Sequence, residues 1–294
     1  MSDRQGLILE NRGVLRIAGK DRCQFLQGIV SNDVTKVSAE RAVWSALLTP
    51  QGKFLHEFFL AERDEAFLLD GEAARQADLQ RRLSIYKLRS KATIEDAGED
   101  FVVAALFGPG SLDALGLPAE AGRAAAFAGG LGFVDPRLAA LGARAILPRD
   151  GAEAALREAG FAAAEAADYD RLRIPLGVPD GSRDLEVEKS ILLENGFDEL
   201  HGVDWDKGCF MGQELTARTK YRALIKKRLL PVEIEGDPPS PGTPVLADGK
   251  EAGIMRSTVD GLGLALLRLE YLEQAPFAAG NAQVTPRKPD WAKF

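Results

Sequence analysis

Hydrophobic and polar positions alternate in short runs along the first part of the chain, and this pattern predicts strands joined by short helices. Residues 13–18 form an alternating strand pattern that Gly19 interrupts. Asp21, with Gln24 three residues later, is typical of a helix start, and Phe25 begins a buried stripe. We therefore expect a strand, a break and a short helix in this order.

A β-hairpin is predicted next along the chain. The apolar runs 44–48 and 54–60 flank a segment with proline and glycine, 49–53, which suits a five-residue turn. Beyond the hairpin, residues 67–69 predict a further strand and residues 72–83 predict a helix.

The middle of the chain alternates short apolar strands such as 101–107 with helical pieces, which is typical of an α+β fold. The Ala-rich stretch 152–167 predicts a helix that ends at Gly160, with a strand or turn beginning at Phe161. Two prolines and two glycines within residues 174–181 exclude long regular structure and predict a shaped loop.

The last part of the chain predicts a small all-β module. Short strands are expected at 229–234, 244–246, 253–257, 263–267 and 282–285. Gly-rich turns separate them, and this pattern favours a barrel. We expect two interleaved α+β subdomains over 1–225, the middle one spanning roughly 50–165, and a β-barrel module over 226–294.

Composition limits the classes of function. The chain has 294 residues with 37 Lys and Arg against 44 Asp and Glu, and its net charge of −7 excludes a generally basic polyanion binder. Its cysteines and histidines are Cys23, His56, His201 and Cys209. They are too scattered for a disulfide scaffold, a structural zinc site or a cluster held by this chain alone. No apolar run approaches the ~18 residues of a membrane helix and none marks a secretory signal, so we expect a cytoplasmic protein without membrane contact.

The densest chemistry lies in residues 206–218, where charges, two glycines and a thiol precede a helix predicted to begin near Gln213. The glycines allow the backbone to approach a ligand closely, and free N–H groups at a helix start favour an anion or a thiolate. Lys207 beside Cys209 is expected to lower the pKa of the thiol. Cys209 is therefore a candidate functional thiol, with a small buried side chain as the alternative.

This stretch resembles a known signature. Residues 207–218 are similar to the pattern K-G-C-[FY]-x-G-Q-E-x-x-x-R of the YgfZ family, folate-binding proteins related to the aminomethyltransferase (T protein) of the glycine cleavage system. Further segments that resemble the family, in the same order, are 25–34, 48–53, 86–92 and 173–179. The resemblance covers nearly all of residues 1–230.

The resemblance implies a T-protein-like fold, in which a clover-like ring of subdomains surrounds a central folate cleft. It also implies a role in the assembly or repair of iron-sulfur enzymes, including those acting in tRNA modification. The implied cofactor is tetrahydrofolate or a derivative, and the implied partners are iron-sulfur client or assembly proteins. Whether any reaction is catalysed stays open.

Folate makes three demands on a site: a carboxylate for the pterin N–H donors, apolar walls for its rings and cations for its glutamyl tail. By the resemblance, Glu194 stands where T proteins carry the carboxylate that faces the pterin. The residues expected to bind folate are Glu194, Arg173, Lys207, Gly208, Phe210, Gly212, Gln213, Glu214, Arg218 and Leu48.

A basic run near the barrel module offers another binding surface. It spans 220–228 and contains five cations, Lys220, Arg222, Lys226, Lys227 and Arg228. On an otherwise acidic protein these cations are expected to attract the tail of polyglutamyl folate, a tRNA or an acidic protein partner. A solvated helix end is the alternative.

A folate-dependent one-carbon transferase is the enzymatic alternative. T proteins need a positioned aspartate that assists attack by the folate nitrogen on the aminomethyl group. Asp78 is the candidate here, and Asp70 replaces an asparagine of the T-protein pattern. The leading hypothesis is a folate-binding accessory factor of iron-sulfur assembly in which Cys209 is the functional thiol.

Overall fold

The computed structural model describes residues 4–222 and 225–294, and the chain divides into two compact units. The first unit consists of Met1–Leu48, Leu55–Ala166 and His201–Met211. The second unit consists of Thr49–Phe54, Ala167–Leu200 and Gly212–Phe294. Each unit therefore assembles segments that are far apart in sequence. Ala223 and Leu224, in the middle of the predicted basic run, lie outside the described residues.

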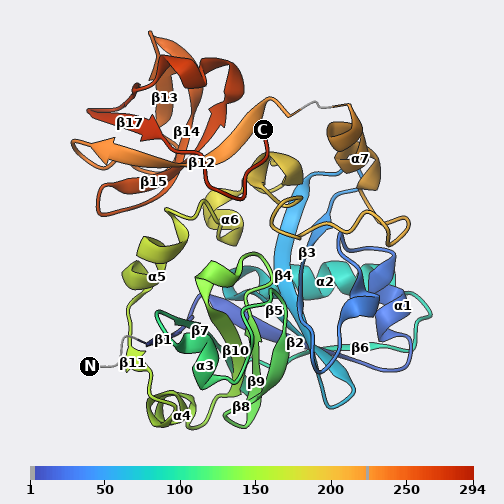
Figure 1. The fold of residues 1–294 in the computed structure, drawn as a ribbon. Helices are drawn as coiled ribbons and strands as arrows, with labels where there is room; N and C mark the ends of the chain where they lie inside the picture. Colours follow the sequence, from blue (N-terminus) through green and yellow to red (C-terminus); the bar gives the residue numbers. More distant parts are fainter. Residues whose placement is uncertain (1–3, 223–224) are drawn as a thin grey trace. The chain divides into compact units, whose positions relative to one another are not determined.

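One sheet of the first unit has five strands in the order β3-β4-β5-β2-β6 (Figure 1). These strands are β2 Arg12–Ala18, β3 Val43–Leu48, β4 Phe54–Arg63, β5 Ala66–Glu72 and β6 Thr93–Asp96. Strands β4, β5, β2 and β6 pair antiparallel with their neighbours. β3 is buried along its whole length, and its side chains are apolar except for that of Ser45, which accepts a hydrogen bond from the backbone N–H of Asn32. The predicted first strand and the hairpin are confirmed.

The other sheet of the first unit has six strands in the order β11-β1-β7-β10-β9-β8. They are β1 Gln5–Ile8, β7 Phe101–Phe107, β8 Ala124–Phe127, β9 Gly130–Val134, β10 Ala143–Pro148 and β11 Ala162–Ala163. β11 runs parallel to β1, and the other pairs are antiparallel. Leu106, Leu147 and Phe161 belong to the apolar core beside this sheet.

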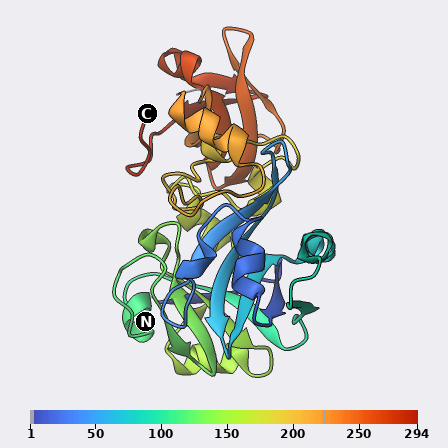
Figure 2. The same ribbon diagram turned by 90° about the vertical axis from the view of Figure 1, so that its right-hand side faces the viewer.

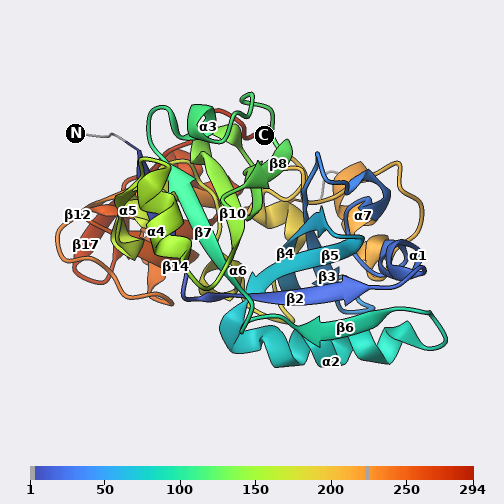
Figure 3. The same ribbon diagram turned by 90° about the horizontal axis from the view of Figure 1, so that it is seen from below.

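Short helices surround these sheets. They are α1 Arg22–Gln27, η1 Val34–Lys36, η2 Ala73–Arg75, α2 Gln76–Lys87, α3 Ser111–Ala114, η3 Ala139–Leu141 and α4 Ala152–Glu158. α2 packs against β2 and β6 through Leu79 and Leu83, which share one helix face (Figure 3). The helix predicted over 72–83 begins and ends about four residues later, because a 3₁₀ turn precedes it.

The second unit contains a closed barrel with the strand order β12-β15-β14-β13-β16-β17, orange to red in Figure 2. Its elements are β12 Lys227–Glu235, β13 Pro244–Ala247, β14 Lys250–Val259, β15 Leu262–Arg268, η5 Leu269–Gln274, β16 Phe277–Ala279 and β17 Ala282–Pro286. Val245, Met255 and Leu267 fill its core. The remaining elements are α5 Ala166–Arg173, α6 Gly181–Asp184, η4 Leu192–Asn195 and α7 Gln213–Tyr221. The predicted α+β class and C-terminal barrel are confirmed.

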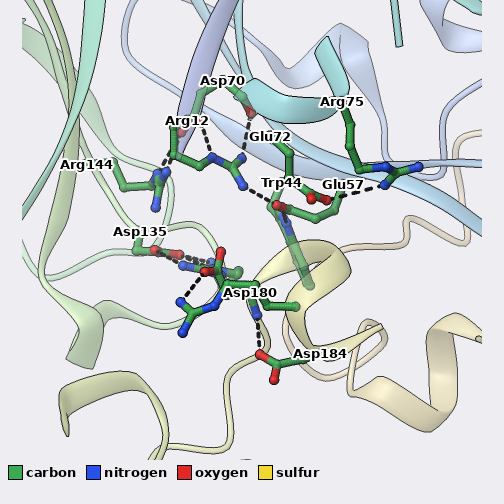
Figure 4. A network of polar contacts seen from close by, with 12 residues as sticks. Arg12, Trp44, Glu57, Asp70, Glu72, Arg75, Asp135, Arg144, Asp180 and Asp184 are labelled. Atoms are coloured by element: carbon green, nitrogen blue, oxygen red, sulfur yellow. Dashed lines mark hydrogen bonds and ion pairs between the residues drawn. The ribbon is translucent and has the colours of Figure 1, made fainter. Parts of the chain in front are cut away.

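A buried ionic network joins the two sheets of the first unit (Figure 4). Arg12 donates from Nε to Asp70 at 2.6 Å and also pairs with Glu57. The other Asp70 oxygen accepts hydrogen bonds from Nε and Nη2 of Arg144 at 2.9 and 2.6 Å. Glu57 accepts from the indole nitrogen of Trp44 at 2.6 Å. All five side chains are buried, so each charge depends on its partners inside the unit.

Three guanidinium groups of this interior surround one aromatic ring. Those of Arg12, Arg137 and Arg144 lie 5.5, 4.9 and 4.1 Å from the ring centroid of Phe59. Arg137 also forms an ion pair with Asp135, with Nη2 and Oδ2 2.7 Å apart. The π faces of the Phe59 ring therefore give these buried guanidinium groups further electrostatic stabilisation.

Asp70→Asn should strongly destabilise the protein. The substitution keeps the side-chain volume but leaves two buried guanidinium groups without their shared anion, which should lower the free energy of unfolding by about 3–5 kcal/mol. Urea titration measures this loss. The matched control is Asp64→Asn, whose side chain is 82% exposed, and it should change stability by less than about 0.5 kcal/mol. Equal stability of the two variants would contradict the role given to the network.

Candidate functional site

Residues 201–211, which include the first half of the signature, are fixed to the loop that follows α1. The Ser31 hydroxyl donates to the carbonyl of Gly202 at 2.6 Å. The backbone N–H of Met211 donates to the carbonyl of Gly28 at 3.2 Å. The structure thus brings together two segments that resemble the family at separate places in the sequence.

The side chain of Lys207 stabilises the contact between these two segments. Its ammonium group donates to the carbonyl oxygens of Gln27, the last residue of α1, and of Val30 in the loop that follows, both at 2.6 Å. It also lies 5.2 Å from the ring centroid of Phe210. Burial lowers the pKa of Lys207 to about 8. The C-terminal end of a helix favours a cation, so the charge of Lys207 is directed to the backbone.

Cys209 is exposed between two anchored neighbours. Lys207 is held by the carbonyl groups of Gln27 and Val30, and Phe210 is 6% exposed. Gly208 between them has a φ of +88°, which favours glycine. The turn therefore presents the thiol to solvent, and the alternative of a small buried Cys209 does not hold.

The second half of the signature forms α7 in the second unit, where the hairpin turn 49–53 packs against it. A Cβ on Gly52 would lie 2.7 Å from the carbonyl oxygen of Gly212 and equally close to Cβ of Leu215. Gly52 and Gly212 have φ values of +78° and +80°. Both positions therefore favour glycine, and the close approach joins the hairpin motif to the signature.

Glu194 lies in η4, on which both α7 and β12 pack. Its carboxylate is half-buried and has no hydrogen-bond partner within residues 4–222 and 225–294. Burial raises the pKa of Glu194, while the nearby cations Lys227, Lys53 and Arg228 act in the opposite direction. A half-buried carboxylate in this state can accept hydrogen bonds from a ligand.

Sequence reasoning did not select Lys53 as a site residue. Lys53 and Lys227 are both half-buried, and neither ammonium group forms an ion pair or hydrogen bond in the described part of the chain. The signal was present, because Lys53 ends the hairpin motif that resembles the family. Its proximity to Glu194 depends on tertiary packing.

Arg173 is completely buried and bonds to residues of its own unit through Nε and Nη1, while its buried Nη2 has no hydrogen-bond partner among the described residues. Its Nε donates to Asp170 at 2.6 Å, and its Nη1 donates to Asp184 at 2.8 Å. A further bond from Nη1 to the carbonyl of Val178, at 3.1 Å, fixes the predicted loop. Asp184 in turn accepts from the hydroxyl of Ser257 in β14 at 2.6 Å. Arg173 therefore connects the loop to the barrel.

The remaining folate candidates differ in exposure. Leu48 is completely buried in β3 and belongs to the core of the first unit. Glu214 and Arg218 are exposed on α7, and Gln213 is half-buried. The structure thus gathers Glu194, Gly212 and α7 in one unit and Lys207, Gly208 and Phe210 in the other.

The cations of the basic run have unequal environments. Arg228 is 4% exposed, and its Nη2 lies 2.6 Å from Glu199 Oε1 in a buried ion pair. Lys220 pairs with Asp198 at 3.1 Å. The others are exposed or half-buried, namely Arg222, Lys226 and Lys227. The run therefore does not form one continuous surface of cations.

Asp78 is saturated by neighbours in the first unit. It lies 2.9 Å from Nε2 of His56, 2.6 Å from Arg81 and 2.7 Å from Arg82. Burial alone would raise the pKa of Asp78, but the hydrogen bonds from these residues hold it well below its usual range. Burial, and then Arg75, lower the pKa of His56 to about 4 despite Asp78. The pair is thus a neutral imidazole beside a carboxylate.

Within the described ranges, no three His, Cys, Asp or Glu side chains gather in a way that would hold a metal ion. The same part of the chain contains no helix with the length and apolar character needed to cross a membrane.

Two family models match the chain. The GCVT N-terminal domain matches residues 9–127, and the CAF17 C-terminal beta-barrel domain matches residues 226–294. Among curated proteins, a human protein named "Iron-sulfur cluster assembly factor IBA57, mitochondrial" is 36% identical over 306 residues, which cover 96% of this chain and 84% of that protein. The mouse protein of the same name is 32% identical over 309 residues, with the same coverage.

The fold is also similar to a solved structure. The crystal structure of glycine cleavage system aminomethyltransferase T from Bartonella henselae matches with a TM-score of 0.78 and 14% identity, over 99% of this chain and 87% of that chain. The T-protein-like fold is therefore confirmed. The prediction of a cytoplasmic protein is contradicted, because the similar assembly factors are named as mitochondrial proteins.

Acid should destabilise the first unit through His56. The pKa of His56 is about 4 in the folded protein against an ordinary 6.5. Between these values the unfolded chain binds a proton that the folded chain does not, so the free energy of unfolding falls as the pH drops through this window. The loss from this residue is on the order of 3 kcal/mol.

Urea titrations at several pH values test this expectation. His56→Gln should flatten the slope between pH 6.5 and pH 4, whereas His201→Asn, at the exposed histidine, should retain it. A wild-type slope in His56→Gln would show that other groups cause the acid sensitivity.

Proposed function

Because this chain belongs to the IBA57 family of iron-sulfur cluster assembly factors, we propose that it supports the assembly of iron-sulfur clusters on client or assembly proteins. The observation that carries the proposal is 36% identity across nearly the whole chain. The resemblance to the YgfZ family is confirmed for the T-protein-like fold and is corrected in its finer assignment, since the relatives are IBA57 proteins, a related family. Support of cluster enzymes that modify tRNA is a narrower form of the same proposal.

We propose that the second unit binds tetrahydrofolate or a derivative through Glu194. The half-buried carboxylate without a hydrogen-bond partner suits the adjacent N–H donors of a pterin. Lys53 and Lys227 supply positive charge for the glutamyl tail. This arrangement meets two of the three demands that folate makes, and both come from side chains within one unit.

Cys209 is proposed as the working thiol of cluster assembly. The exposed side chain is held in place by its anchored neighbours Lys207 and Phe210. A thiolate is a ligand for iron and a nucleophile toward sulfur. With two cysteines in the whole sequence, the chain cannot supply four thiolates to a cluster. Cys209 therefore acts together with ligands from a partner.

A folate-dependent one-carbon transferase is a weaker proposal. Its candidate, Asp78, is held by Arg81 and Arg82, which keep its pKa far below the range useful for proton transfer. A tRNA-binding module is weaker as well, because Arg228 is buried against Glu199 and Lys220 is paired with Asp198.

Glu194→Gln should weaken tetrahydrofolate binding roughly 10- to 100-fold, the equivalent of a lost charge-assisted hydrogen bond of about 1.5–3 kcal/mol. Calorimetric titration with tetrahydrofolate and its 5-formyl analogue measures the affinity. Glu235→Gln, at an exposed position of β12, is the control and should bind like the wild type. Absence of binding by the folded wild-type protein would exclude the folate site.

Cys209→Ala should abolish support of cluster enzymes while folate binding is retained. The measurement is the activity of a [4Fe–4S] dehydratase in a strain that lacks the endogenous assembly factor and expresses each variant. Cys23→Ala removes the other thiol, which is half-exposed in α1, and should support activity like the wild type. Full support by Cys209→Ala would remove the thiol from the mechanism.

A further inference from the structure

An exposed apolar and basic region covers the C-terminal part of α2 and the turn after it. This region, residues 81–91, is named the α2 surface. Five large hydrophobic side chains are exposed in the described residues, and three of them lie here. Ile85 is 56% exposed, Tyr86 is 38% exposed and Leu88 is 85% exposed. Exposed apolar groups that are adjacent in this way mark an interaction site more often than single ones do.

The same run is strongly basic. It contains no acidic residue and five cations, Arg81, Arg82, Lys87, Arg89 and Lys91. Arg89 and Lys91 are exposed, whereas Arg81 and Arg82 pair with Asp78. The whole chain has a net charge of −7, so the α2 surface is opposite in sign to the protein that carries it.

The packing of α2 gives this surface a fixed shape. Leu79 and Leu83 are buried on the face toward the sheet, and Gln80 donates from Nε2 to the carbonyl of Ile94 in β6 at 3.0 Å. Figure 3 shows α2 along β6 and β2. Ile85 comes two positions after the buried Leu83 and is therefore directed away from the sheet. The contacts on the buried face keep the helix in this orientation.

Leu88 is presented in a conformation that disfavours it. Its φ of +47° and ψ of −113° at the end of α2 form a backbone combination that favours glycine. Two hydrogen bonds close the turn around it: Lys87 Nζ donates to the carbonyl of Ala92 at 2.9 Å, and Ser90 N–H donates to the carbonyl of Lys87 at 2.9 Å. Strain of this kind clusters at functional sites.

We propose that the α2 surface docks an acidic protein partner that packs an apolar group against Ile85, Tyr86 and Leu88. The inference rests on the proposed function, and the partner is a client or assembly protein of the cluster pathway. Arg89 and Lys91 attract its carboxylates, while the apolar side chains supply the desolvated centre of the interface.

Two other classes of partner suit the surface less well. A single-stranded nucleic acid stacks successive bases on aromatic faces, and the α2 surface offers one such face, Tyr86, beside the aliphatic Ile85 and Leu88. Anionic lipid surfaces are bound by clusters of about 4–8 Lys and Arg, whereas Arg81 and Arg82 of the α2 surface are paired with Asp78. An acidic protein with an apolar pocket satisfies both features at once.

The double variant Leu88→Gly/Arg89→Glu tests the proposal in the full chain. Glycine adopts the φ of +47° and ψ of −113° at this position without strain, so the variant should fold with thermal stability at least equal to that of the wild type and with unchanged tetrahydrofolate binding. Support of the [4Fe–4S] dehydratase in the deletion strain should fall roughly ten-fold or more, as for a lost interface hot spot. Lys250→Glu, at an exposed barrel position, makes a charge reversal elsewhere and should leave support unchanged.

The outcomes separate this inference from the proposed function. Full support by the folded double variant, with wild-type protein active, overturns the docking surface and leaves the proposed function intact. A wild-type protein that fails to restore the dehydratase overturns both. A photoreactive residue at Ile85 should capture an acidic cluster-pathway protein in cells, and the double variant should lose this capture.

Two further probes test the class of partner. Wild-type protein should not co-sediment with phosphatidylglycerol vesicles and should not bind tRNA through the α2 surface. If the wild-type protein binds the vesicles or tRNA and the double variant does not, the protein partner is overturned in favour of a membrane or a nucleic acid.

Discussion

The Asp70 carboxylate, bound by Arg12 and Arg144 without any exposure to water, is the constraint on which the first unit depends. A buried charge is tolerated only with partners at hydrogen-bond distance, and here they come from strands of both sheets. Any shift between the sheets would separate a carboxylate from a guanidinium group in a region that water does not reach. The pairing therefore fixes how the two sheets face each other.

Strand β4 connects this ionic network to the face of the five-stranded sheet on which α2 packs. His56 and Glu57 are neighbours, and side chains of neighbouring strand residues point to opposite faces. Glu57 enters the network around Arg12, whereas His56 contacts Asp78 in α2. The position of α2, and with it the shape of the α2 surface, is thus coupled to the ionic interior through one strand.

Local signals predicted most of the fold. Helix starts, the glycine-containing hairpin turn and the alternating barrel strands depend on residues close in sequence, and the structure has them where expected except for α2, which begins at Gln76 instead of residue 72. The contact of Asp70 with Arg144 spans 74 positions, and no local pattern reveals such a pair. The basic run shows the same limit: five cations within nine residues suggest one surface, but the fold buries Arg228 against Glu199, while Arg222 and Lys226 stay exposed. β16 was not predicted because three residues are too few for a periodic pattern.

The signature is dense in charged residues and glycines because its two halves perform different tasks. Lys207, Gly208 and Phe210 shape a turn that exposes a thiol in the first unit. From Gly212 onward the chain caps α7 and receives the hairpin turn beside Glu194 in the second unit. Glycines with positive φ at 208 and 212 allow one short run to satisfy both sets of contacts. Because each task relies on contacts within its own unit, a change at the thiol need not alter the carboxylate site, and the two chemistries can be varied separately.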